Sequence, residues 1–417
     1  MTFCETMFHF LNKRRSAGIA VLTVLCLVVG GTGAASDLEF LEMHKDGVGA
    51  VTELRSPNAC TVSADGEQLY VAATNSSAIV QFERNPVTGR LTFQAVYDEG
   101  ANGINGISGV FDVALSPDGN HLYAAGGSDD AVVLFDRDTT TGNLTFVEPY
   151  YDGEGGIDGL DRVYSLAVSP DGANVYAAAI TDDSVVAFAR NPTTGQLDFI
   201  AAYFDGVGGV TGMDWPLSVM TDNAGNYVYV GSITSDAVVI FERTPGTGDL
   251  TFVDAFTGSG FLSFYDLAGS PDDEFLYGTD SSGDRLHVFD RNPVTGLITP
   301  IESHLDSVDG VDGLDGAFAT LMDPNGLFVA TLASEDSAVA LFRRNPNDGR
   351  LLFNGALFDG EGGVDGLTDV QLGCVGPHGR TVYGAGWDDD AISVFGVAAF
   401  ADAFEFGGSM RWSAVVP

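Results

Sequence analysis

The stretch SPDGANVYAAAITDDSVVAFARNPTTGQLDFIAAY, residues 169–203, contains two turn motifs, SPDG and NPTTG, with apolar runs between and after them. The runs NVYAAA, SVVAFAR and LDFIAAY are short, rich in β-branched and aromatic residues, and bounded by Gly, Pro, Asp and Asn, which is typical of β-strands. The run SLAVS, directly before the stretch, predicts one more strand. One unit of the sequence therefore predicts four strands.

Both turn motifs recur along the chain. The first places its turn at Gly66, Gly119, Gly172, Gly225, Asp273, Gly326 and Gly379, in steps of 53 residues with one step of 48. The second places its turn at Gly89, Gly142, Gly195, Gly248, Gly296 and Gly349. Four strands per period of about 50 residues are the signature of a β-propeller blade, whose central strands are apolar on both faces because blades stack on each other. The sequence predicts an all-β protein formed by a single seven-bladed β-propeller.

The second motif is missing after the last unit, which ends with the predicted third strand AISVF at 391–395. The segment DLEFLEMHKDGVGAV from Asp37 matches GQLDFIAAYFDGVGGV of the third unit. Leu38 to Phe40 should therefore supply the outer strand of the seventh blade, which would leave fewer free sheet edges.

The repeated pattern S-P-D-G-x-x-[LV]-Y followed by N-P-x-T-G-x-L resembles the seven-bladed lactonase-type propellers, a superfamily that includes bacterial 6-phosphogluconolactonase and fungal carboxymuconate cyclase. The pattern, of the WD40/YVTN-like kind, covers residues 37–395. The resemblance implies the fold, whereas propellers host many unrelated activities.

The two ends of the chain read as targeting segments. Lys13, Arg14 and Arg15 precede an apolar run and the small residues TGAA at 32–35, which is typical of a secretory signal peptide over residues 1–35. The propeller is expected over 36–396. The tail, 397–417, is similar to a D-G-F-E-S-G-D-x-S-x-W-S sorting signal of exported bacterial proteins, with departures at Ala403 and Phe406. We therefore expect a secreted or periplasmic protein without a membrane span, and a monomer.

The formal net charge of -40 argues against nucleic acid and anionic membranes as partners, because both would be repelled. Strand alternation predicts that the loops between blades, such as YDGEGGIDGLDR at 151–162, and the loops between second and third strands emerge on one face, called the top face. Six arginines, Arg84, Arg137, Arg190, Arg243, Arg291 and Arg343, are expected beside the turns of the opposite face, called the base.

Calcium is the specific hypothesis for the acidic top loops, because hard cations take carboxylate oxygens and glycine permits tight turns around an ion. The alternative is that Asp and Gly are good turn residues and that surplus acid keeps the protein soluble. The candidate ligands are Asp152, Asp158, Asp161, Asp205, Asp306, Asp312, Asp315, Asp359 and Asp365.

No CxxCH, dinucleotide, GxSxG, HExxH or P-loop motif is present, so neither haem nor nucleotide is expected. The polar residues expected at the top mouth of the central channel are Arg55, Asp112, Arg162, Asp214, Trp215, Asp266 and Asp369. Asp112, Arg162, Asp214 and Asp369 are the catalytic candidates, and they could equally be hydrogen-bonded channel residues. Arg55, Trp215 and Trp387 are candidates for binding a ligand.

The residues before the inner strands include no histidine, in contrast to many family members, and the histidines elsewhere are interpreted as structural. The sequence therefore favours a binding or scaffold module that meets a protein or glycan partner on the acidic face. The alternative is a hydrolase acting on a small lactone.

Cys60 and Cys374 fall on the predicted inner strands of the first and seventh blades, which are neighbours in a closed ring. An exported protein favours a disulfide, and a bridge requires Cα atoms within about 7 Å. A disulfide and two buried thiols both remain open at this point.

Overall fold

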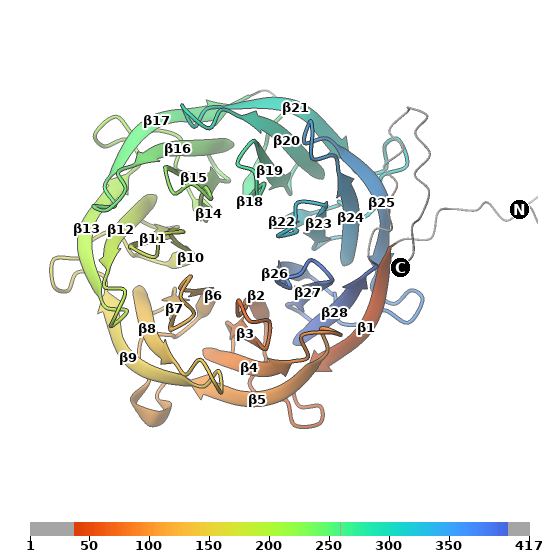
Figure 1. The fold of residues 1–417 in the computed structure, drawn as a ribbon, viewed down its shortest axis with the longest axis horizontal. Helices are drawn as coiled ribbons and strands as arrows, with labels where there is room; N and C mark the ends of the chain where they lie inside the picture. The colour runs from red at the N-terminus through yellow and green to blue at the C-terminus, as the bar shows by residue number, and fades with distance from the viewer. Residues whose placement is uncertain (1–36, 259, 399–417) are drawn as a thin grey trace, which may run out of the picture. The chain divides into compact units, whose positions relative to one another are not determined.

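The computed structural model describes residues 37–258 and 260–398. Seven four-stranded antiparallel sheets are arranged as blades around a common axis (Figure 1). The seven-bladed propeller expected from the repeat is confirmed. The expected signal peptide and most of the expected tail lie outside the described residues.

In six blades the strands run in chain order from the axis outward, and in the seventh β26, β27 and β28 are followed by β1. The inner strands are β2 (Pro57–Val62), β6 (Val110–Leu115), β10 (Val163–Val168), β14 (Pro216–Thr221), β18 (Phe264–Gly269), β22 (Ala317–Met322) and β26 (Val370–Val375). The second strands are β3 (Gln68–Ala73), β7 (His121–Gly126), β11 (Asn174–Ala179), β15 (Tyr227–Ser232), β19 (Phe275–Asp280), β23 (Phe328–Ala333) and β27 (Thr381–Gly386). The third strands are β4 (Ala78–Arg84), β8 (Ala131–Arg137), β12 (Ser184–Arg190), β16 (Ala237–Arg243), β20 (Arg285–Arg291), β24 (Ala338–Arg344) and β28 (Ala391–Val397). The outer strands are β5 (Leu91–Asp98), β9 (Leu144–Tyr151), β13 (Leu197–Phe204), β17 (Leu250–Thr257), β21 (Ile298–Leu305), β25 (Leu351–Phe358) and β1 (Leu38–Lys45). One short 3-10 helix, η1 (Ala101–Gly103), lies in the loop between β5 and β6.

The core lies between blades. Every residue of the second strands is buried, as in β11 and β15, because both sheet faces are covered by neighbouring blades. One apolar cluster, for example, joins Tyr176 and Val185 of the third blade to Val228 and Phe241 of the fourth. Burial on two faces explains why these strands are mostly apolar, without the alternation of polar and apolar residues seen in half-exposed strands.

The ring closes between the two ends of the chain. The strand β1 pairs with β28, with Leu38 opposite Val397 and Phe40 opposite Phe395, as the sequence predicts. On the inner strands, Cys60 and Cys374 form a disulfide across a Cα separation of 5.6 Å. The bridge joins the first blade to the seventh and resolves the alternative that the sequence left open.

The arginines of the base are buried between blades. Arg243 is representative: its guanidinium donates to the hydroxyl of Tyr176, to the carbonyl of Gly225 and to both carboxylate oxygens of Asp171, at 2.7–3.0 Å. Tyr176 in turn donates to the carbonyl of Gly248 at 3.0 Å. We call this arrangement the Tyr–Arg clamp.

The clamp recurs at six of the seven joints between described blades. Its Tyr and Arg members are Tyr383 and Arg84, Tyr70 and Arg137, Tyr123 and Arg190, Tyr176 and Arg243, Tyr229 and Arg291, and Tyr277 and Arg344. In the sixth blade Arg344 holds the clamp position, because the register beyond the bulge at Leu341 and Phe342 places it opposite Leu351. The adjacent Arg343, which the sequence analysis named, pairs with Asp37 instead. The joint between the sixth and seventh blades carries Ala330 and Val397 at the clamp positions instead.

Candidate functional site

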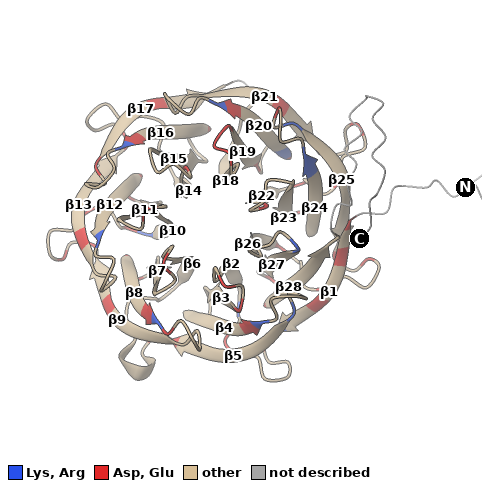
Figure 2. Ribbon diagram, viewed as in Figure 1, with Lys and Arg blue, Asp and Glu red and all other residues tan. Residues whose placement is uncertain are grey.

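The loops between blades and the loops between second and third strands emerge at one end of the ring, as expected from the strand directions. Acidic residues dominate the chain, with 58 Asp and Glu against 18 Lys and Arg, and blue segments are correspondingly few in Figure 2. The described part of the chain contains no helix with the length and hydrophobicity of a membrane span.

The first acidic residue of each long top loop organises the loop itself. The Asp152 carboxylate accepts the backbone N–H of Leu160, eight residues later, at 3.0 Å. The same hydrogen bond joins Asp46 to Leu54, Glu99 to Ile107, Asp205 to Met213, Asp306 to Leu314, and Asp359 to Leu367. These side chains therefore have a structural role whether or not a cation is present.

A second set of top carboxylates ties five of the blades to the next. Asp130 accepts the backbone N–H of Arg162 at 2.8 Å, and Asp183 accepts that of Trp215 at 2.9 Å. Both N–H groups belong to residues that directly precede an inner strand and have positive φ, 59° for Arg162 and 58° for Trp215. Such a conformation is costly for a bulky residue and is concentrated at functional sites.

The residue before the inner strand therefore forms a ring around the axis, which we call the left-handed ring. Its members are Ser56, Gly109, Arg162, Trp215, Ser263, Gly316 and Asp369. Three of the residues expected at the mouth, Arg162, Trp215 and Asp369, occupy this one step of the repeat. Trp215 is 45% exposed, and the Arg162 guanidinium lies 5.9 Å from the centroid of the Phe111 ring.

Asp112 and Asp266 lie below the left-handed ring, as the third residues of the inner strands β6 and β18. Asp112 accepts the N–H groups of Val113 and Leu166, at 2.7 and 2.9 Å. Asp266 accepts those of Leu267 and Thr320, both at 2.9 Å. Each carboxylate thus bridges its own inner strand and the inner strand of the next blade.

Asp112 and Asp266 are each half-buried, and the surrounding blades enclose their carboxylates. Burial raises the pKa of Asp112 to about 6, despite its two backbone hydrogen bonds. Burial raises the pKa of Asp266 to about 7, and the negative charge of Asp112 adds to the shift. The two side chains therefore share one electrostatic environment, in which each can hold or release a proton near neutral pH.

Aromatic side chains lie above the two carboxylates. Tyr164 is 8% exposed, its ring lies 4.8 Å from that of Phe111, and burial together with the charges of Asp112 and Asp266 raises its pKa. On the fifth and sixth blades, the ring of Tyr265 lies 4.4 Å from that of Phe318. We define the axial site as Asp112, Asp266, Tyr164, Tyr265 and the left-handed ring above them. The sequence analysis missed the two tyrosines, although Tyr265 directly precedes Asp266 and Tyr164 holds the same position of the repeat.

The remaining mouth residues lie higher on the top face. Asp214 accepts no loop hydrogen bond of the kind described above, and its backbone N–H donates to Ser235 at 3.1 Å. Arg55 is exposed and contacts Glu53 and Ser76. Trp387 is half-buried, and its backbone N–H donates to the backbone carbonyl of Asp369. Burial and the charge of Asp388 raise the pKa of the Asp369 side chain.

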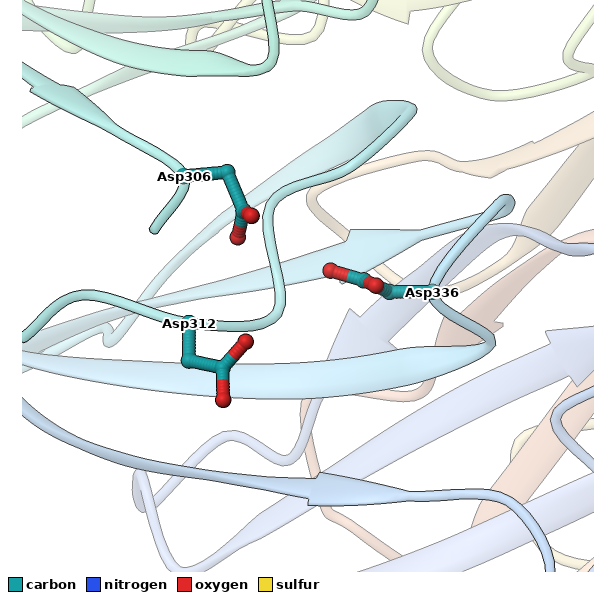
Figure 3. A group of neighbouring side chains, drawn as sticks. All are labelled: Asp306, Asp312 and Asp336. Atoms are coloured by element: carbon teal, nitrogen blue, oxygen red, sulfur yellow. The ribbon is translucent and has the colours of Figure 1, made fainter. Parts of the chain in front are cut away.

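Four of the nine calcium candidates meet in two groups. Asp306 and Asp312 come together with Asp336 (Figure 3), and Asp359 and Asp365 come together with Asp389. In each group one oxygen per residue lies within 4.8 Å of the others. Asp336 and Asp389 were missed in the sequence because they come from the loops between second and third strands, 24 residues further along.

The other five candidates are arranged differently. Asp152 and Asp205 hold their loops, as described above. Asp158 lies near Asp182, whose pKa is raised by burial and by the charges of Asp152, Asp161 and Asp158. Asp161 and Asp315 have raised pKa values through burial and neighbouring carboxylates, to about 6 for Asp315, which contacts Asp284.

These features define a class of protein: a seven-bladed β-propeller with an acidic top face and two axial carboxylates. The family described as "Lactonase, 7-bladed beta-propeller" matches residues 154–260. The resemblance to the lactonase-type propeller superfamily that the repeat indicated is confirmed.

Three known proteins show how far the similarity extends. The chain is 25% identical over 138 residues to 6-phosphogluconolactonase of Bacillus subtilis, a match that covers 33% of this chain and 39% of that protein. The periplasmic gluconolactonase of Pseudomonas aeruginosa shares the fold with a TM-score of 0.59 and 20% identity, over 73% of this chain and 86% of that one. A β-propeller domain of Swd1 from Myceliophteria thermophila superposes with a TM-score of 0.61 at 11% identity, over 86% and 99% of the two chains. The structural matches establish the fold alone.

Proposed function

We propose that the protein hydrolyses lactones at the axial site. The observation that carries the proposal is the pair of enclosed carboxylates, Asp112 and Asp266, whose raised pKa values suit general acid–base chemistry near neutral pH. The similarity to proteins named as 6-phosphogluconolactonase and gluconolactonase supports this function better than the binding or scaffold role that the sequence favoured.

The axial residues would divide the reaction between them. One ionised carboxylate, Asp112 or Asp266, takes a proton from a water molecule while the water oxygen bonds to the lactone carbonyl carbon. The ring C–O bond then breaks, and the leaving oxygen takes a proton from the second, protonated carboxylate. Tyr164 and Arg162 provide O–H and N–H donors near the same end of the ring for the carbonyl oxygen.

The charge of the site indicates the substrate class. Asp369, Asp214 and the carboxylates of the top loops surround the axial site, so a phosphorylated lactone would be repelled. The exposed ring of Trp215 offers a stacking surface for a sugar. We therefore propose a neutral, hydroxylated lactone as substrate. The disulfide fits an oxidising compartment, so we place the reaction outside the cytoplasm.

The test is the hydrolysis of glucono-1,5-lactone, which is monitored as acid release above the spontaneous rate. Asp112→Asn and Asp266→Asn should each lower kcat by 100-fold or more, roughly the contribution of a general base. Ser165→Ala is the matched control, because Ser165 holds the same position on β10 and should tolerate the change within a few-fold. Full activity in both Asn variants, with folding retained, would overturn the axial site.

We further propose that the two carboxylate groups of the top face, around Asp306 and Asp359, hold calcium. A comparison of the repeats supports this, because the residues at the positions of Asp312 and Asp336 change together from one blade to the next. These positions are occupied by Thr52 and Ser76, Asn105 and Asp129, Asp158 and Asp182, Thr211 and Ser235, Asp312 and Asp336, and Asp365 and Asp389. Where one carboxylate is absent the other is absent too, or is paired with an amide, which fits a shared cation and not independent turn residues.

Thermal melting with millimolar calcium or with chelator, at fixed ionic strength, tests this proposal. Calcium should raise the melting temperature by several degrees. The double variant Asp312→Thr with Asp336→Ser copies the pair found in the fourth blade and should remove part of the rise. Identical melts with and without calcium would leave these carboxylates as solvated loop residues and would not affect the lactonase proposal.

A further inference from the structure

The fifth blade departs from the other six at three positions in contact with one another. Its second strand ends in Asp280, where the other blades have Ala, Gly or Ser. Its third strand has His287, where four blades have valine. Its outer strand has Ser303, where the third, fourth and sixth blades have alanine. Three polar side chains thus replace small or apolar ones in a single blade.

Hydrogen bonds connect the three side chains in a row. The hydroxyl of Ser303 lies 2.6 Å from Nδ1 of His287. On the other side of the ring, Nε2 of His287 lies 3.3 Å from Oδ2 of Asp280. Asp280 is fully buried and is fixed by the backbone N–H groups of Gly283 and Leu262, at 2.7 and 2.8 Å.

The imidazole is held in one orientation. His287 is 1% exposed and packs against Phe261, at 4.5 Å between ring centroids, and Phe264, at 5.8 Å. The carboxylate at Nε2 favours the tautomer with a proton on Nε2, which leaves the lone pair of Nδ1 to accept the hydroxyl proton. Ser303 itself is exposed on β21, the edge strand of its sheet. A nucleophile, a base and a group that orients the base are therefore present, with only the nucleophile open to solvent.

We propose that Ser303 is the nucleophile of a second, esterase-type site that accepts small acyl esters, with His287 as its base and Asp280 as the positioning residue. The serine oxygen bonds to the acyl carbon and its proton moves to Nδ1. The ester C–O bond breaks and the alcohol leaves with that proton. Water then attacks the acyl-serine, which releases the carboxylic acid and restores the hydroxyl. An edge strand presents backbone N–H groups to solvent, and these are the donors available to the developing oxyanion.

The site is independent of the lactonase proposal, because none of its residues belongs to the axial site. It also changes the interpretation of His287, which the sequence indicated only as a structural residue. The partners of His287, on a neighbouring and on the outer strand, could not be read from the sequence without the register.

A fluorophosphonate probe tests the nucleophile directly, since it forms a covalent bond to an activated serine with loss of fluoride. Peptide mass spectrometry of the full chain should locate the label on Ser303, and Ser303→Ala should abolish it. His287→Val should lower the labelling rate by about 100-fold or more, in the range of a lost general base. Both substitutions copy residues of the fourth blade, Ala255 and Val239, so the fold should survive.

Two further measurements separate chemistry from structure. His304→Gln, one residue along the same strand, should leave labelling unchanged. Asp280→Asn keeps an oxygen for the backbone N–H groups but loses the charge, so kcat for p-nitrophenyl acetate should fall by about 10-fold with KM unchanged. An unlabelled Ser303 in the folded protein, or labelling of His287→Val at the wild-type rate, would overturn the proposal.

Discussion

The base and the top face of the ring use the same residue, aspartate in a turn, with opposite electrostatic results. At the base, partial burial raises the pKa of Asp171, but hydrogen bonds from Ser169 and Arg243 outweigh burial and leave the pKa below its ordinary value. On the top face, burial and the charges of Asp306, Asp312 and Asp284 together raise the pKa of Asp336. The base compensates its negative charges, whereas the top face accumulates them.

This difference assigns the two faces different tasks. Each clamp of the base joins two blades through a buried guanidinium, so charge there contributes to the stacking of blades. The top carboxylates bind mainly backbone N–H groups, which organise the loops without neutralising them. Uncompensated charge is costly for folding and is therefore where a ligand, cation or reaction would act. Predictions that probe each face can break or sharpen this distinction.

The largest effect is expected at the base. Arg243→Met would leave the carboxylate of Asp171 and the buried side chains of Tyr176 and Asn174 without their shared donor. Removing one partner of a buried ion pair costs about 3–5 kcal/mol, and we expect about 3 kcal/mol because Asp171 keeps contact with water. Urea unfolding of the two proteins measures the difference.

Arg90→Met is the matched control for that substitution. Arg90 pairs with Glu42 at 2.6 Å, but its side chain is 49% exposed. An exposed ion pair contributes about 0–1 kcal/mol, so the midpoint should hardly move. Equal losses for Arg90 and Arg243 would contradict the special role of the clamp.

The second prediction concerns how the stability of the fold changes with pH, which the raised pKa values of the axial carboxylates should dominate. The folded pKa values of Asp112 and Asp266, about 6 and about 7, lie above the unfolded value of 3.8. The folded state therefore binds more protons between about pH 4 and 7, and stability should fall as pH rises through that window. At the base, Asp118 has a pKa lowered to about 2, so its contribution is lost as pH falls below about 4.

We therefore expect the highest melting temperature between about pH 4 and 5, with a loss of roughly 2 kcal/mol by pH 8 after discounting the residual contact with solvent. Melting curves in chelator at fixed ionic strength measure it. The double variant Asp112→Asn with Asp266→Asn should flatten the alkaline side of the curve. A stability that rises from pH 5 to pH 8 would show that compensated carboxylates dominate both faces.

The repeat made the fold readable from the sequence, whereas the sites required three-dimensional register. Strand number, the closure by Leu38 to Phe40 and the burial of second strands follow from period and composition. The meeting of Asp312 with Asp336 and of His287 with Ser303 depends on which loops and strands lie side by side, and no local pattern encodes it. The same limit applies to the clamp of the sixth blade, since the adjacent Arg343 and Arg344 look alike until the strand pairing is known.

The smallest predicted effect is a gain in stability on the top face. Trp215 holds a φ of 58° at a position where Gly109 and Gly316 stand in two other blades. Trp215→Gly should remove the strain and raise the free energy of unfolding by up to about 1 kcal/mol, reduced by the greater freedom of glycine in the unfolded chain. Ser263→Gly, at the same ring position with a φ of 46°, is the control and should give a similar gain. Only Trp215→Gly should raise KM for the lactone, because only that change removes a stacking surface. A loss of stability in Trp215→Gly would contradict the strain at this position, and an unchanged KM would show that the Trp215 ring does not serve the axial site.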